Sequence, residues 1–153
     1  MDAIALLQQQ HRELERLFAR AKRSDDPGAV IDRIADALAL HAALEERRFY
    51  PATRSLRSAD RLREAVEDHL AMKQLVADLM SCEPGDAAVE AGLNRLAEQV
   101  AQHVEQEERE LFPQVALSLS PDELEELGLA LQDLADELLV PAPATRAEGA
   151  PLD

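Results

Sequence analysis

Length, composition and charge exclude several classes of protein before any motif is considered. The chain has 153 residues, a length that one hydrophobic core can serve. With three Phe, one Tyr and no Trp, that core must be filled mainly by Leu and Ala, which favours helices. The 31 acidic residues outnumber the 16 basic ones, and the net charge of −15 repels nucleic acid and anionic lipid. Cys82 is the only cysteine of the sequence, which excludes an internal disulfide and leaves nitrogen and oxygen as ligands for any bound metal.

Neither a membrane segment nor a secretory signal is expected. Arg, Asp and Glu interrupt the apolar stretches well before the ~20 residues that a membrane-spanning helix needs. Asp2 precedes the first apolar positions and no basic region stands before them, unlike in a secretory signal. We therefore expect a cytoplasmic protein with no membrane partner.

Four amphipathic helices are predicted from apolar residues that recur at three- and four-residue steps. The four apolar patterns cover residues 4–18, 31–49, 62–80 and 89–111. Pro51 and Pro113 are expected to end the second and fourth helices, because a proline ring blocks continuation of an α-helix. Helices of this length joined by short loops predict an all-α protein, an up-down four-helix bundle.

An additional C-terminal helix is predicted from Pro121 to about Leu139. Ser120 is a suitable N-cap, Pro121 suits the first helical position, and acidic residues follow in the first turn. We expect this helix to pack against the outside of the bundle, so that residues 1–140 form one domain. Residues 141–153 lack periodicity and large apolar side chains and are predicted to be a disordered tail.

An internal repeat links the second and fourth helices. Residues 41–51 and 103–113 share the pattern H-x3-E-E-R-x-[FL]-[YF]-P. Each copy follows a helix that carries one histidine on its apolar face, His11 in the first case and His69 in the second. Two helix pairs therefore each offer one histidine, and then a histidine and a glutamate spaced one turn apart.

These residues predict a metal centre in the core. If a core-facing stripe takes three positions in seven, all four histidines fall on it by chance with a probability of about 0.03. A buried carboxylate without a partner costs several kcal/mol, so a cation must stand opposite each glutamate. Two divalent ions balance two carboxylates and a bridging hydroxide better than one ion does. The predicted ligands are His11, His41, Glu45, His69, His103 and Glu107.

We expect the first helix pair to supply the histidines of one ion and the second pair those of the other, with both glutamates bridging. Mixed imidazole and carboxylate ligation favours iron, with manganese and zinc as alternatives, over calcium or magnesium. Glu46 and Glu108 are rival ligands, but their rotation about the helix axis favours exposed roles paired with arginine. Glu15 is a weaker spare carboxylate.

The two H-x3-E-E-R motifs that end in Tyr-Pro and Phe-Pro resemble the hemerythrin-like HHE cation-binding domains. The resemblance extends over residues 1 to about 140 and includes residues 120–128, which are similar to the start of the C-terminal helix in bacterial members. It implies two iron ions, bridged by two carboxylates and an oxo or hydroxo group, that bind dioxygen at one iron. The ligands that it implies by position are the same six residues.

Lys73 marks a departure from the oxygen-carrying members of that family. These have a further histidine one turn after the residue that corresponds to His69, where this chain has Lys73. One ligand fewer leaves an iron with an open position, which favours reaction with peroxide or another small ligand over reversible oxygen carriage. Lys73 can donate a hydrogen bond or bind weakly at the site, or it can extend to the bundle surface, and the sequence leaves both interpretations open.

The resemblance and the open position lead to two main functional hypotheses. In the first, a di-iron pair binds and reacts with O2 or hydrogen peroxide in a catalase-like, oxidative-stress role, and no side chain is evident as a separate catalytic base. In the second, the same site senses O2, nitric oxide or iron, or stores iron, without catalysis. A third hypothesis, a purely structural bundle, predicts no metal. In each case the acidic surface favours a monomer or weak dimer.

Overall fold

The computed structural model describes residues 1–139, which contain helices and no strand. The elements in chain order are α1 (Ala3–Lys22), α2 (Gly28–Leu44), η1 (Glu45–Phe49), α3 (Tyr50–Ala52), η2 (Arg54–Leu56), α4 (Ala59–Met80), α5 (Ala87–Gln106), η3 (Glu107–Leu111), α6 (Phe112–Ser118) and α7 (Pro121–Leu139). The all-α prediction is confirmed. The predicted tail, residues 141–153, lies outside the described residues, and the division of the chain at residue 140 stays a prediction.

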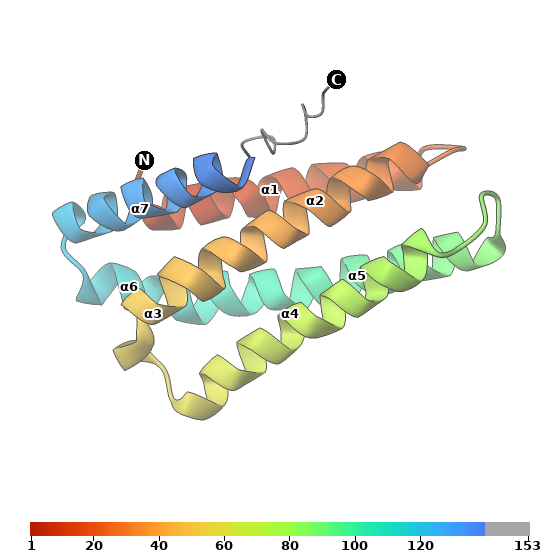
Figure 1. Cartoon of the computed structure of the whole chain (residues 1–153). Helices are drawn as coiled ribbons and strands as arrows, with labels where there is room; N and C mark the ends of the chain where they lie inside the picture. The colour runs from red at the N-terminus through yellow and green to blue at the C-terminus, as the bar shows by residue number, and fades with distance from the viewer. Residues whose placement is uncertain (140–153) are drawn as a thin grey trace, which may run out of the picture.

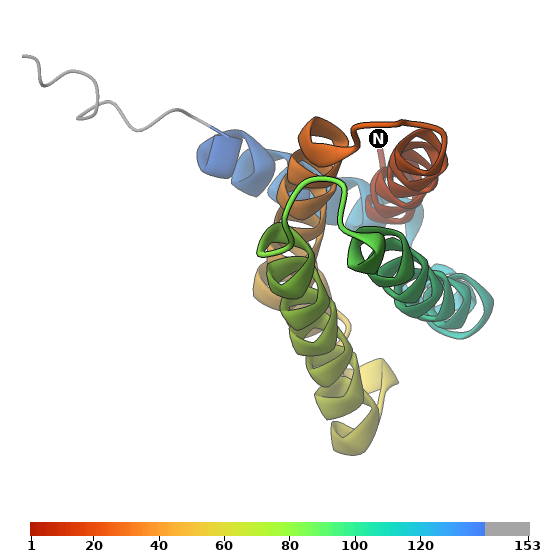
Figure 2. The ribbon, with the colours of Figure 1, turned by 90° about the vertical axis from the view of Figure 1, so that its right-hand side faces the viewer.

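The long helices α1, α2, α4 and α5 form an up-down bundle, as predicted (Figure 1). Each of these helices contacts two of the others, α1 with α2 and α5, and α4 with α2 and α5. The end-on view in Figure 2 shows the four helices around a common centre and α7 outside them. Helix α7 packs on α1 and α2, which confirms the additional C-terminal helix. Among the helices of residues 1–139, none is both long enough and apolar enough to cross a membrane.

Side-chain caps fix where the helices begin. A carboxylate oxygen of Asp2 accepts from the backbone N–H of Ala5 at 2.8 Å, and Ser58 and Asp86 cap α4 and α5 in the same way. At α7, Ser120 and Glu123 form a capping box, in which each side chain accepts from the backbone N–H of the other residue. The predicted start of α7 is therefore confirmed at the level of individual hydrogen bonds.

The prediction that Pro113 ends its helix was wrong, whereas the helix that contains Pro51 ends one residue after it, at Ala52. A five-residue π-helical turn precedes each proline, η1 before Pro51 and η3 before Pro113, and helical backbone continues beyond both, to Ala52 and to Ser118. In an α-helix the proline ring clashes with the carbonyl group four residues earlier. The wider π-turn separates the ring from that carbonyl, so the chain keeps its direction. The repeated motif thus encodes the same local distortion twice, and each distortion begins at a predicted ligand.

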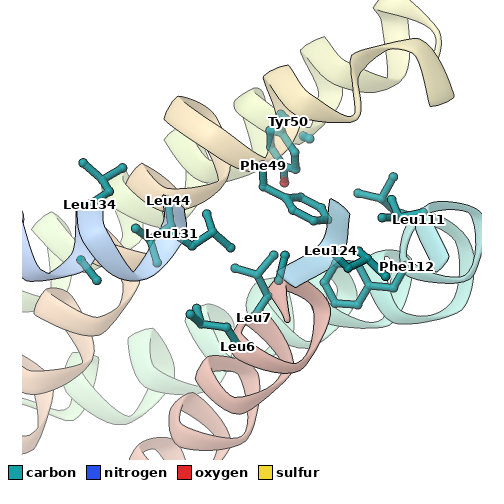
Figure 3. Packing of buried hydrophobic residues seen from close by; sticks show 14 residues of the cluster. Leu6, Leu7, Leu44, Phe49, Tyr50, Leu111, Phe112, Leu124, Leu131 and Leu134 are labelled. Atoms are coloured by element: carbon teal, nitrogen blue, oxygen red, sulfur yellow. The ribbon is translucent and has the colours of Figure 1, made fainter. Parts of the chain in front are cut away.

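Two apolar clusters fill the bundle, one at each end. The first contains residues of α1, η1, η3 and α6 together with Leu124, Leu131 and Leu134 of α7 (Figure 3). The second lies toward the two hairpin loops and is built from α1, α2, α4 and α5. On α1, Leu7 belongs to the first cluster and Leu14 to the second, and a histidine lies between them. On α2 and α4 a histidine likewise lies between residues of the two clusters, whereas on α5 His103 is followed by one more residue of the second cluster before the first begins at Leu111 of η3. The four histidines therefore lie where the two clusters meet.

Gly128 allows the start of the chain to pack directly against α7. A Cβ atom added at Gly128 would lie 2.2 Å from the carbonyl oxygen of Met1 and 2.9 Å from the carbonyl carbon of Asp2. Both are backbone atoms and cannot rotate away. We predict that Gly128→Ala lowers the free energy of unfolding by about 1–3 kcal/mol, the usual cost of overpacking, measured by urea denaturation.

Gly28→Ala is the matched control for this prediction. A Cβ atom at Gly28 meets no atom closer than 3.7 Å, and alanine has the higher helix propensity. This variant is expected to be as stable as the parent or slightly more stable. Equal stabilities for the two variants would contradict the proposed contact between α7 and the N-terminal backbone.

Candidate metal centre

The structure brings the six predicted ligands together in the layer between the two apolar clusters. Each of the four histidines and two glutamates has at most 3% of its surface exposed. The potential ligand atoms form two groups, and the atoms of each group all lie within 4.8 Å of one another. The first group is formed by His11, His41, Glu45 and Glu107, and the second by Glu45, His69 and His103. Glu45 belongs to both groups, the position expected of a bridging carboxylate.

The inner ring nitrogen, Nε2, of every histidine faces a glutamate, and these contacts follow an approximate two-fold pattern. Nε2 of His11 lies 3.2 Å from a carboxylate oxygen of Glu107, and Nε2 of His69 lies 3.0 Å from one of Glu45. The remaining two histidines each lie 3.3 Å from the glutamate one turn later on their own helix. The two copies of the sequence motif therefore occupy equivalent places around one centre.

The outer ring nitrogen, Nδ1, of each histidine also has a side-chain oxygen as its neighbour. Nδ1 of His11 lies 2.7 Å from Glu108, and Nδ1 of His69 lies 2.5 Å from Glu46. An acceptor at Nδ1 fixes the proton there and leaves the lone pair of Nε2 directed at the centre, the arrangement that orients histidine ligands in metal sites. The other two outer contacts are His41 with Gln10 at 2.7 Å and His103 with Asp68 at 3.8 Å.

Sequence reasoning assigned Glu46 and Glu108 to exposed positions paired with arginine, and this was only partly correct. Glu108 does pair with Arg12, and the side chains of Glu46 and Glu108 are 30% and 24% exposed. Each nevertheless contacts a histidine of the other helix pair. The available signal was the second glutamate of the Glu-Glu pair, which occurs in both copies of the motif. The spare carboxylate, Glu15, is 56% exposed and pairs with Arg12, outside the buried cluster.

Tyr50, the tyrosine that ends the first motif before its proline, also lies at the site. It is 4% exposed, and its hydroxyl lies 2.9 Å from Glu45 and 2.6 Å from Glu107. Burial and the two nearby carboxylates raise the pKa of Tyr50 well above its ordinary value, so the phenol keeps its proton and donates. The ring stacks on His69 at a centroid distance of 5.8 Å.

The equivalent position of the second motif is Phe112, which stacks on His11 at 5.7 Å. The two halves of the centre thus share their ring stacking and differ by one hydroxyl group. The alternation of Tyr and Phe at this motif position was visible in the sequence. The role of the tyrosine could not be inferred from the sequence, because only the fold shows that this position faces the glutamates.

The chemistry of the donor set fits metal ions. Burial alone would raise the pKa of Glu45, but attraction to His41 and hydrogen bonds from neighbouring histidines lower it well below its usual range. Burial opposes charge on His103 as well, yet Glu107 holds its pKa well above the ordinary value. Even so, Nε2 of His41 and one oxygen of Glu45 have no hydrogen-bond partner. Buried atoms of this kind need a ligand, and a cation bound between them satisfies both.

A cavity of about 200 Å³ reaches this centre from the side of the bundle. His41, His69 and His103 line its buried end. Lys73 also lines the cavity and is exposed to solvent. The rest of the wall consists of Leu, Val, Ala and Met side chains of α1, α2, α4 and α5. A small molecule can therefore reach the histidines through apolar surroundings that exclude bulk water.

Comparison with known proteins agrees with the geometry. Residues 2–115 match the hemerythrin HHE cation-binding domain. The chain belongs to this family. Its fold is similar to the crystal structure of a hemerythrin HHE cation-binding-domain protein from Mycobacterium kansasii, with a TM-score of 0.77 and 21% identity over 90% of this chain and 86% of that one.

One curated relative is much longer than this chain. A protein described as a DNA nickase from Nostoc sp. is 27% identical over 124 residues, which are 79% of this chain and 35% of that protein. The chain therefore spans about a third of the length of the curated relative that it matches. The remainder of that protein lies outside the aligned residues.

The outer carboxylates yield a prediction on metal affinity. Removing the partner of a ligating histidine typically costs 10–100-fold in metal affinity, and we expect about that loss in Glu46→Ala and in Glu108→Ala. Glu46→Gln keeps an acceptor for Nδ1 and is expected to lose less. Affinity is measured by competition with a chelator. Glu13→Ala, which removes an exposed carboxylate paired with Arg16, is the control and should bind metal as the parent does.

Metal removal yields a prediction on stability. A ligand present at about 100 times its Kd stabilises the folded state by about 2.7 kcal/mol, which corresponds to a rise in Tm of about 5–10 °C at this chain length. We expect a chelator to lower the Tm of the HHE domain by this amount in differential scanning calorimetry. The double variant His41→Ala, His103→Ala should show no such shift. A Tm that is independent of metal in the parent protein would contradict the site.

Proposed function

We propose that this HHE domain is a non-haem di-iron protein that binds and reacts with a small oxygen species, O2 or hydrogen peroxide. The observation that carries the proposal is the pair of buried ligand groups that share Glu45. Both groups consist of histidine nitrogen and glutamate oxygen alone, a mixture that suits iron and does not suit calcium or magnesium. The ligands would be His11, His41, Glu45, His69, His103 and Glu107.

The two halves of the centre differ in a way that supports reaction at one side. The second ligand group contains three residues where the first contains four. Lys73, which takes the place of a further histidine, is exposed. His69 and His103, two of the three residues of that group, also line the cavity, together with His41 of the first group. When bound, iron supplies one-electron redox chemistry and a coordination position that these protein ligands leave free.

The remaining residues position the reactants and exclude water. Tyr50 donates its hydroxyl hydrogen to Glu107 and so holds the orientation of that carboxylate. The outer partners of the histidines keep their protons on Nδ1. The apolar cavity wall admits a small neutral molecule such as hydrogen peroxide more readily than a hydrated ion. In a catalase-like reaction one peroxide is oxidised to O2 and a second is reduced to water, so no external reductant is needed.

DNA nicking, the activity in the name of the Nostoc relative, is not proposed for this chain. The net charge of −15 opposes contact with a phosphate backbone. The same charge separates copies of the protein, and we propose a monomer or weak dimer. A cytoplasmic role in oxidative stress, with O2, hydrogen peroxide or nitric oxide as the small-molecule partner, completes the proposal.

The test combines metal analysis with peroxide turnover. The protein is purified aerobically, iron, zinc and manganese are quantified per chain, and O2 release is followed after addition of hydrogen peroxide. We expect two irons per chain and rapid O2 release, with both reduced in His69→Ala and unchanged in Glu15→Gln. Two irons without turnover would refute the enzymatic proposal in favour of sensing or iron storage at the same site. A chain without metal would refute both.

A further inference from the structure

We propose that the cavity beside the histidines binds a small amphipathic organic anion, with its apolar part inside the cavity and its carboxylate at Lys73. The inference goes beyond the reaction with an oxygen species and rests on the proposed function only in that the cavity ends at the proposed metal ligands. It is carried by the size of the cavity, by its apolar wall and by Lys73, the one lysine or arginine among the residues that line it.

The cavity is larger than an oxygen species requires. O2 and hydrogen peroxide each have two heavy atoms, whereas the cavity volume is about 200 Å³. A dry protein cavity of about 150 Å³ lined by aliphatic side chains holds benzene, so by proportion this one holds about eight carbon atoms. Its wall is formed mainly by aliphatic residues such as Leu38, Val76 and Val100. A surface of this kind favours an alkyl or aryl group over water.

Lys73 supplies the charge that selects an anion. Lys73 is the cationic residue among those that line the cavity, and it is exposed while the histidines at the other end are buried. Within residues 1–139 it forms no ion pair with a carboxylate. Arg12 and Arg109, by contrast, each pair with a glutamate. In a chain with a net charge of −15, a cation left unpaired beside an apolar cavity is complementary to a ligand that is apolar at one end and anionic at the other.

This placement puts the apolar end of the ligand next to the metal ligands. The carboxylate would remain at the exposed end, where water and Lys73 both solvate it. The alkyl chain would extend toward His41, His69 and His103. The site would then discriminate by chain length at the buried end and by charge at the exposed end.

The experiment is a calorimetric titration of the metal-loaded protein with straight-chain alkanoates from butanoate to dodecanoate. Each added methylene contributes about 0.8 kcal/mol, so affinity should rise about fourfold per carbon until about eight carbons fill the cavity, and then level off. The 1-alkanol of equal length is titrated as the uncharged probe. Heats of binding are measured whether or not the protein turns over peroxide, so failure here is distinguishable from failure of the proposed function.

Three variants test whether octanoate binds in the cavity. Ala39→Phe, at an exposed position that lines the cavity, should abolish binding of octanoate while metal content and Tm stay unchanged. Lys73→Met should weaken octanoate binding about two- to fivefold, the usual strength of an exposed ion pair, and leave 1-octanol unaffected. Lys22→Met removes the other lysine of the chain, which lies away from this cavity, and should change neither.

Two results would overturn the proposal. Octanoate binding that persists in Ala39→Phe, or that does not depend on chain length, would show that the anion binds elsewhere. Equal affinities for octanoate and 1-octanol, with Lys73→Met indistinguishable from Lys22→Met, would show a cavity that takes neutral apolar molecules without selecting an anion.

Discussion

The burial of two carboxylates among four imidazoles in the middle of a helical bundle is the interaction on which the rest of this structure depends. Each of these side chains is at least 97% removed from solvent, and a buried charge is tolerated only when a partner balances it. Around this layer the apolar residues divide into two clusters. The helices must therefore keep their register, because a shift of one residue would turn the histidines away from the glutamates.

The repeated motif explains how two half-sites are built from one local design. In both copies the glutamate begins a π-helical turn, and a proline follows the turn. In both, the first glutamate faces the centre and the second orients a histidine of the other helix pair. Turns of this kind are rare and are enriched at functional sites. The asymmetric elements are few, chiefly Tyr50 against Phe112 and the cavity lined by two histidines of the second ligand group and one of the first, and these are the features to which we assign reactivity and selectivity.

Much of the fold could be predicted from the sequence, because apolar periodicity and caps such as Ser120 are local signals. The meeting of the six candidate ligand residues was predicted for the same reason, since each lies on the apolar face of its own helix. The continuation of the helix past Pro113 could not be predicted, because proline normally ends a helix and the π-turn that accommodates it has no simple sequence signature. The contacts of Tyr50 and Glu46 depend on which helices are neighbours, and no periodicity contains that information.

The central claim is that one buried cluster holds two metal ions, and anomalous diffraction from crystals of the aerobically purified protein tests it most directly. Data collected on both sides of the iron absorption edge locate each iron independently of the protein coordinates. The account predicts two iron peaks, one in each ligand group, on either side of Glu45. A single peak, a different metal, or iron bound only at surface carboxylates would contradict it.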